Sequence, residues 1–316
     1  MLLYVLFFSC LLHARGKSDE NAAKPLKIYI IKGSSGMGMV RLFDEPPQIR
    51  GFTITIEALA HVDLMAARFL SGEAMVGILP PNMAAKIRAS GRDIRAAAVI
   101  GSGMLSLLSS DPALQTLEDL RGKTVEVAGQ GATPDYVFRR ILSARGLVPD
   151  QDVKLGYSLA YPEIAQSLIA GRISAALLPA PFATMARLGR PALVSVADIQ
   201  EEWSRAGGAG NYPMTLLVLD GAFAAAHAPA AGDILDAAKK SIEWVQNNPE
   251  EAGILAEKHE LGLKAAVVAA AVPKSKICFI PAAEERPSLE ALFRVFLEYA
   301  PASIGGVLPG SGFYYK

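Results

Sequence analysis

Apolar positions along the chain follow two alternating periods. Short runs rich in β-branched residues predict buried strands, and the segments between them carry apolar residues at helical spacing. Strands are expected at 26–31, 52–56, 75–79 and 96–100, and helices at 62–71 and 82–90. This alternation predicts an α/β fold in which mostly parallel sheets are flanked by helices. The same order of elements begins again at Lys123.

Two pairs of segments repeat at matching places in this pattern. Residues 27–33 (Lys-Ile-Tyr-Ile-Ile-Lys-Gly) align without a gap with 123–129 (Lys-Thr-Val-Glu-Val-Ala-Gly), and 70–80 matches 169–179 in its order of helix end, glycine, strand and proline. An internal duplication of one α/β unit would explain the nearly constant spacing. Two independent units built on the same βαβ pattern are the alternative. Either origin predicts two lobes.

The two units predict a cleft between the lobes. Lobe 1 combines residues 25–109 with 211–316, and lobe 2 spans 110–210. Ligands of open α/β sheets sit at the carboxyl ends of the strands, so these ends can face one another across the cleft. The two chain crossings between the lobes then form a hinge that can close over a ligand.

The C-terminal part is expected to pack back on lobe 1. It begins with one strand, at 215–219, and is then mostly helical. The expected helices are 230–248, 249–260, 263–271 and 289–299.

Residues 1–24 are interpreted as a leader and linker. The apolar run 1–12 is shorter than the roughly 20 residues that a membrane-spanning helix needs, and it suits the apolar centre of a secretion signal. Ser9 and Cys10 at its end resemble a bacterial lipoprotein signal, in which lipid is attached to the cysteine. The alternatives are ordinary cleavage near Ala14 or an uncleaved anchor. Export, with or without lipid attachment at Cys10, predicts that the protein lies in the periplasm or on the outer face of the cytoplasmic membrane.

Charge and composition exclude several classes of function. Lys and Arg balance Asp and Glu at 31 each, which gives no overall field to attract nucleic acid. The chain has two cysteines and four histidines, and their spacing suggests no metal site, disulfide framework or catalytic set. We therefore expect a protein that is not an enzyme and uses no cofactor, metal or nucleic acid. A monomer is expected as well.

A Gly-rich turn follows the first predicted strand and opens a short helix. Glycines let the backbone approach a ligand closely, and amides at a helix start favour an accepting or anionic group. The spacing matches neither the dinucleotide fingerprint nor the phosphate loop. The alternative is a plain tight turn. The candidate ligand contacts here are Gly33, Ser34, Ser35, Gly36 and Met37.

The matching turn in lobe 2 is expected to face the first turn across the cleft. Its candidate contacts are Gly129, Gln130, Gly131 and Thr133. Thr133 can cap the next helix, with Pro134 in the first helical position, and a well-capped helix is the alternative to ligand binding. Asp135 would place a carboxylate in the first turn and compete with a bound anion, so the charge of the ligand stays open.

Four further candidates lie where other strands end. Asn82 follows Pro80-Pro81 and can either contact the ligand or cap its helix. Phe182 follows Pro179-Ala180-Pro181 and can offer an apolar face to a planar ligand or pack in the core. Ser102 and Tyr212 lie near the two expected crossings and can line the cleft from the hinge.

From about Lys27 to its end, the chain resembles substrate-binding proteins of ABC transporters in the nitrate, sulfonate and taurine group, which also includes thiamine-pyrimidine binders. The widespread element is 117–123 (Leu-Glu-Asp-Leu-Arg-Gly-Lys), at the entry to lobe 2. Where members commonly have Leu-Pro-Glu-Pro-Phe, this chain has Ala180 in place of Glu. The other segments that carry the resemblance are 33–40, 71–73, 129–134, 178–182, 248–252, 304–309 and 313–316.

The resemblance implies a two-lobed, type II periplasmic-binding-protein-like fold and a role in import. The protein would capture a small molecule, such as a sulfonate or a pyrimidine, between its lobes and deliver it to an ABC transporter permease. An enzyme on the same scaffold, of the pyrimidine-synthesis or menaquinone-pathway type, is the alternative, and a ligand-sensing domain is a third.

Overall fold

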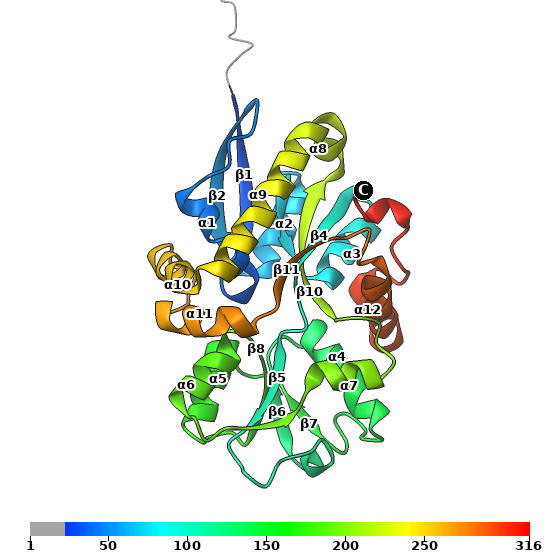
Figure 1. Cartoon of the computed structure of the whole chain (residues 1–316). Coiled ribbons are helices and arrows are strands. Elements are labelled where there is room, and N and C mark those ends of the chain that lie inside the picture. Colours follow the sequence, from blue (N-terminus) through cyan, green and yellow to red (C-terminus); the bar gives the residue numbers. More distant parts are fainter. Residues whose placement is uncertain (1–22) are drawn as a thin grey trace, which may run out of the picture.

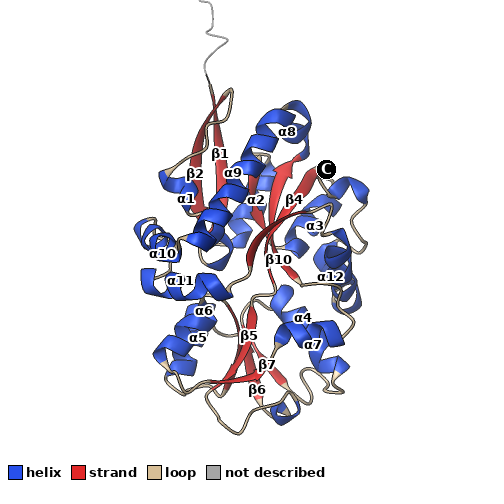
Figure 2. Ribbon diagram, viewed as in Figure 1, coloured by secondary structure: helices blue, strands red, loops and turns tan. Residues whose placement is uncertain are grey.

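Two β-sheets form the centres of two lobes in the computed structural model, which describes residues 23–316 (Figure 1). The predictions for the leader, including lipidation of Cys10, lie outside the described residues. Each sheet is flanked by helices (Figure 2).

The first sheet has six strands in the order β11-β4-β10-β3-β1-β2. Strand β1 pairs in parallel with β2 and β3, whereas β10 and β11 run antiparallel to their neighbours. All four residues of β3 are buried, as expected for a strand inside a sheet. The strands are β1 (Lys24–Ile31), β2 (Phe52–Leu59), β3 (Val76–Leu79), β4 (Ile94–Ser102), β10 (Pro213–Asp220) and β11 (Ile277–Pro281).

The second sheet has five strands in the order β7-β6-β8-β5-β9. Strand β5 pairs with β8 and β9, so residues 105–109, which the sequence analysis places in lobe 1, belong to the second sheet. The chain crosses between the lobes directly before them. The strands are β5 (Leu105–Ser109), β6 (Thr124–Val127), β7 (Lys154–Gly156), β8 (Ala175–Pro179) and β9 (Val194–Ala197).

Helices cover both sheets. In Figure 1, α9 crosses in front of the first sheet, and α2 and α3 lie behind it. Helices α5 and α6 pack on β8 in lobe 2. The helices are α1 (Arg41–Asp44), α2 (Val62–Ser71), α3 (Pro81–Ala89), α4 (Thr133–Ala144), α5 (Tyr161–Ile169), α6 (Phe182–Gly189), α7 (Ile199–Arg205), α8 (Gly221–Ala226), α9 (Ala228–Asn247), α10 (Pro249–Lys258), α11 (Ala265–Ala271) and α12 (Arg286–Tyr299), with 3-10 turns η1 (Ser34–Met39), η2 (Glu118–Leu120), η3 (Val272–Lys274), η4 (Pro301–Ile304) and η5 (Ser311–Phe313).

The two sheets repeat one strand arrangement. Strand β1 lies between β2 and β3 in the first sheet as β6 lies between β7 and β8 in the second, with parallel pairing in both. Strand β3 then pairs antiparallel with β10, as β8 does with β5. The repeated segments of the sequence therefore occupy matching places in the fold.

Both sheets are mixed rather than mostly parallel, because the strands next to the lobe crossings run antiparallel. The C-terminal part also holds a second strand, β11, where the sequence pattern predicts one strand followed only by helices. Its apolar run is only five residues long, and pairing with β4 sets its conformation.

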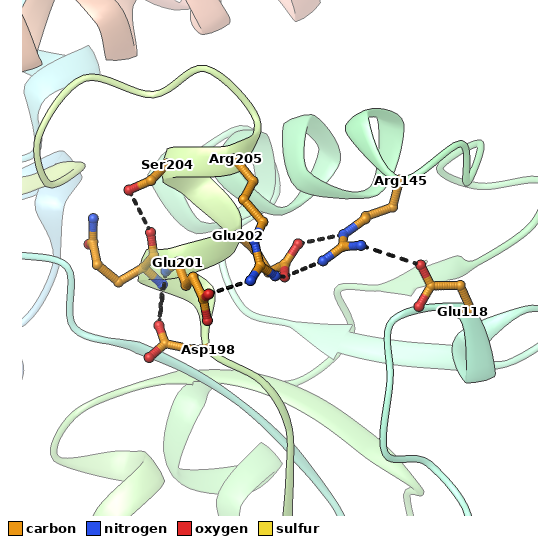
Figure 3. Close-up of polar contacts among 8 residues, drawn as sticks. Glu118, Arg145, Asp198, Glu201, Glu202, Ser204 and Arg205 are labelled. Carbon is orange, nitrogen blue, oxygen red and sulfur yellow. Dashed lines mark hydrogen bonds and ion pairs between the residues drawn. The ribbon is translucent and has the colours of Figure 1, made fainter.

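A buried carboxylate fixes α7 to the rest of lobe 2 (Figure 3). The side chain of Glu202 is 7% exposed and accepts hydrogen bonds from Arg145 Nε over 2.6 Å and from Arg205 Nη1 over 2.6 Å. Asp198 precedes α7, and its side chain accepts hydrogen bonds from the amides of Gln200 and Glu201. These bonds give partners to free amides in the first turn of the helix.

No helix in the described part of the chain is both long and apolar enough to cross a membrane.

Candidate functional site

Loops from both lobes meet at the carboxyl ends of β1, β3, β6 and β8. Asn82 Nδ2, in the first turn of the helix α3 that follows β3, donates to the carbonyl oxygen of Gly131, in the turn after β6, over 3.4 Å. A Cβ atom placed on Gly33, after β1, would lie 3.9 Å from the ring of Phe182, after β8. Each Gly-rich turn thus lies close to the segment that follows the third strand of the opposite repeat. Direct apposition of Gly33 and Gly129 stays a prediction.

The first Gly-rich turn is a 3-10 helix that packs into lobe 1. Gly33 has φ 89°, in the left-handed region that favours glycine, and its amide donates to the carbonyl of Leu261 over 2.9 Å. A Cβ on Gly36 would lie 2.5 Å from the carbonyl oxygen of Ile31. Met37 is 1% exposed. Gly36 and Met37 therefore serve close packing within the lobe.

The serines of this turn are more accessible than its buried end. Ser34 and Ser35 are both half-buried. Ser35 Oγ accepts a hydrogen bond from Thr215 Oγ1 over 3.3 Å. Ser34 Oγ, in contrast, has no hydrogen-bond partner among the residues that the structure describes.

The second Gly-rich turn places a buried hydroxyl at the start of α4. Gly129 and Gly131 have φ 81° and 77°, and Gln130 between them is exposed. The residue before the helix is Ala132, so Thr133 is not the helix cap that the sequence suggests. Thr133 is 2% exposed, and its Oγ1 has no hydrogen-bond partner.

Asp135 stabilises this turn from inside lobe 2. It is 1% exposed and accepts hydrogen bonds from the Gly131 amide over 2.8 Å, from Arg139 Nε over 2.7 Å and from Tyr157 Oη over 2.7 Å. Burial raises the pKa of Tyr157, which keeps its phenol protonated as a donor. The Gly131 amide is therefore already occupied, and Arg139 balances the carboxylate charge.

Asn82 lies inside the first turn of α3 rather than at its cap. The helix begins at Pro81 after the capping residue Pro80. Asn82 Oδ1 is buried and has no hydrogen-bond partner, although the amide nitrogen of the same side chain reaches Gly131. The capping alternative is thus wrong for Asn82.

Phe182 forms an aromatic pair with a residue that sequence reasoning missed. Its ring stacks on Tyr161, with centroids 5.4 Å apart and an interplanar angle of 17°. Tyr161 begins α5, its hydroxyl donates to the Ala128 carbonyl over 3.4 Å, and burial raises its pKa. The sequence signal for Tyr161 was its position directly before Pro162 at the start of a helix. Only the folded structure brings this side chain next to the Gly-rich turn after β6.

Ser102 and Tyr212 lie at the two crossings between the lobes. Ser102 ends β4 and is 4% exposed. The Gly103 amide donates to the Tyr212 carbonyl over 3.1 Å, and the Leu105 amide donates to Tyr212 Oη over 3.2 Å. Tyr212 is fully buried, and these two hydrogen bonds hold the two crossings together.

No group of three or more His, Cys, Asp or Glu side chains in residues 23–316 is placed to hold a metal ion.

Solved structures share this architecture over most of the chain. An ABC transporter protein from Parabacteroides distasonis is 23% identical, with 93% of this chain and 99% of that chain covered and a TM-score of 0.78. The periplasmic aliphatic sulphonate-binding protein SsuA from Escherichia coli is 17% identical, with 93% of each chain covered and a TM-score of 0.72. The nitrate-binding protein NrtA from Synechocystis is 10% identical, with 92% and 83% covered and a TM-score of 0.64. The predicted type II fold is confirmed.

The comparison with curated proteins returns no match. The model of the NMT1-like family matches residues 59–258, which is more than half of the 316 residues. The match runs from the end of β2 to the end of α10 and includes the turn after β6 and the loops after β3 and β8. This chain therefore belongs to the NMT1-like family.

Proposed function

We propose that the protein is the extracytoplasmic solute-binding component of an ABC importer. It would capture a small molecule, such as a sulfonate or a pyrimidine, between its lobes and deliver it to a permease. The observation that carries the proposal is a pair of buried oxygens without partners. Asn82 Oδ1 lies in the first turn of α3 in lobe 1 and Thr133 Oγ1 at the start of α4 in lobe 2, beside the Asn82–Gly131 contact between the lobes.

Unpaired buried polar groups have an energetic cost that a bound ligand can remove. Each costs about 1–3 kcal/mol of stability when no partner is present. A solute between the lobes could donate to Asn82 Oδ1, and the Thr133 hydroxyl could donate to it or accept from it. The Phe182–Tyr161 stack adds a flat apolar surface close to these loops. The site thus supports binding of a small polar molecule with a planar or apolar part.

The fold and the relatives support the transport part of the proposal. SsuA binds aliphatic sulphonates and NrtA binds nitrate, according to their names, and both share the two-lobed fold. A solute that contacts both lobes favours the closed state over the open one, and this difference is a signal that a permease can recognise. Delivery from outside the cytoplasm agrees with the leader expected at 1–24.

The first test is binding without turnover. We expect native mass spectrometry of the protein purified from its own host to show one retained small molecule. Thermal-shift screening of sulfonates, pyrimidines and amino-acid-like compounds should then find a ligand that raises the Tm. Chemical conversion of the retained compound would contradict the proposal and favour an enzyme.

Two variants test the site itself. Asn82→Ala and Thr133→Val should each weaken ligand binding about tenfold or more, because a buried hydrogen bond to the solute is lost. Thr133→Val should not lower the Tm of the ligand-free protein, since the deleted oxygen has no partner there. Asn82→Ala also removes the Nδ2 hydrogen bond to the Gly131 carbonyl, so its ligand-free Tm should fall slightly. Isothermal titration calorimetry measures the affinity.

Matched substitutions outside the loops serve as controls. Asn247→Ala removes an exposed amide at the end of α9, and Thr55→Val removes an exposed hydroxyl on β2. Both should bind the ligand as the unmodified protein does. Equal affinity in all four variants would place the solute elsewhere.

A further inference from the structure

A cavity lies beside the hinge, and Gly33, Asn82 and Gly131 are not among the residues that line it. It measures about 260 Å³ and is bounded by the crossing before β5, by β9, α6 and the start of α7 from lobe 2, and by the segment between η3 and β11 from lobe 1. In Figure 1 the chain from α11 to β11 runs beside the junction of the lobes. We call this space the hinge cavity.

Positive charge dominates the lining of the hinge cavity. Three cationic residues line it, Arg187 from lobe 2 and Lys274 and Lys276 from lobe 1. None of the three forms an ion pair with a carboxylate in the described part of the chain. Their charges are therefore available to a molecule that enters the cavity.

The single acidic residue in this lining is already engaged. Asp198 Oδ1 accepts the amides of Gln200 over 2.9 Å and Glu201 over 3.0 Å at the start of α7. These contacts direct the carboxylate toward the helix start and compensate part of its charge. The cavity therefore keeps a net excess of cationic groups.

The hinge itself forms one wall of this cavity. Gly103 and Met104 of the first crossing line it, and the Gly103 amide is bonded to Tyr212 of the second crossing. Gln200 also lines it and bonds through Nε2 to the Gly210 carbonyl over 3.1 Å. A molecule that contacts Arg187 and either Lys274 or Lys276 would therefore touch both lobes beside the segments that must rotate when they separate.

We propose that the hinge cavity binds a small oxyanion with more than one negative charge and thereby favours the closed state of the lobes. Cationic side chains recognise oxyanions through charge-assisted hydrogen bonds, which are stronger than those between neutral groups. Because Arg187 and the two lysines come from different lobes, opening would separate the groups that hold the anion. By linkage, the anion also raises the affinity for any solute that binds the closed state.

Inorganic phosphate is the probe for this site. Phosphate at about 10 mM should raise the Tm of the unmodified protein by about 2–4 °C, as a ligand of millimolar to sub-millimolar affinity does. Sodium chloride at equal ionic strength should give a smaller shift, since it only screens charge. Sulfate and malonate in parallel would distinguish inorganic anions from dicarboxylates as the preferred oxyanion.

Charge-removal variants show whether the hinge cavity is responsible. Arg187→Ala and the double variant Lys274→Ala/Lys276→Ala should each lose most of the phosphate shift. The control Lys154→Ala/Lys239→Ala removes two exposed lysines, one from each lobe and outside this cavity, and should keep it. A shift that persists in the first two variants, or that chloride reproduces, would overturn the proposal.

Failure of this proposal can be told apart from failure of the proposed transport function. Asn82→Ala should keep the phosphate shift while its solute binding is weakened. The Lys274→Ala/Lys276→Ala variant should still bind the solute, with an affinity that no longer rises when phosphate is added. A phosphate shift lost in Asn82→Ala would place the anion in the interlobe site and contradict a separate hinge site.

Discussion

Glu202 shows at the residue scale how one buried charge can hold several elements of lobe 2. Its carboxylate joins Arg145, at the end of α4, to Arg205 in α7 (Figure 3). Hydrogen bonds from Arg145 lower the pKa of Glu202 below its ordinary value of 4.5. We predict that Glu202→Gln lowers the free energy of unfolding at pH 7 by about 1.5–3 kcal/mol, because charged hydrogen bonds to a buried group are lost.

The lowered pKa of Glu202 predicts how the stability of the folded protein changes with pH. A carboxyl whose pKa is lower in the folded protein stabilises it above the unfolded pKa, near 4.5, and loses this effect as the pH falls through the folded pKa. The difference between Glu202→Gln and the unmodified protein in urea titrations should therefore shrink below about pH 4. The exposed neighbour Glu201→Gln should stay within about 0.5 kcal/mol at all pH values. A stability difference between Glu202→Gln and the unmodified protein that does not change with pH would contradict a stabilising role of the ionised Glu202 carboxylate.

At the scale of elements, the loop after α7 packs against Trp203 only because residue 208 has no side chain. A Cβ on Gly208 would lie 2.1 Å from Cε2 of Trp203, which is fully buried. We predict that Gly208→Ala lowers the free energy of unfolding by about 1–3 kcal/mol through overpacking. Urea titration followed by tryptophan fluorescence measures it.

Gly232 in α9 provides the matched control for this prediction. A Cβ there would meet no atom within 4 Å, and the residue lies inside a helix. Gly232→Ala should therefore raise the free energy of unfolding by about 0.5–1 kcal/mol. If both alanine variants shifted stability in the same direction, close packing at Gly208 would not be the cause.

At the scale of the whole molecule, an aromatic contact between α4 and α12 holds the lobes together beside the hinge. Tyr136 of lobe 2 packs on Phe296 and Tyr299 of α12, with ring centroids 5.0 and 6.1 Å away. Tyr299 Oη donates to Ser143 Oγ over 3.1 Å. We predict that Tyr299→Ala shifts the ligand-free protein toward open lobes and increases its radius of gyration in small-angle X-ray scattering.

Tyr299→Phe separates the two parts of this contact. It keeps the ring stack and removes one exposed hydrogen bond, so its radius of gyration should match that of the unmodified protein. An unchanged radius in Tyr299→Ala would show that other contacts determine closure.

Much of the fold could be predicted from local patterns. Helix α2 was predicted at its observed bounds, and the strands β1, β2 and β4 lie where β-branched runs were found. The repeat also gave the matching roles of β1 and β6, because glycine turns and buried strands depend on local backbone preferences. The position of β5 in the second sheet was not predicted, because pairing with β8 and β9 joins residues far apart in sequence.

The candidate site was likewise predictable in part from the sequence. The sequence by itself determined that polar, Gly-rich loops would follow the strands of two similar units, since these residues set the local backbone. Only the tertiary structure decided which groups are free: Asp135 is neutralised by Arg139, whereas Asn82 Oδ1 and Thr133 Oγ1 have no partner. Hydrogen-bond partners and burial depend on contacts between distant segments, and packing of the two lobes sets those contacts.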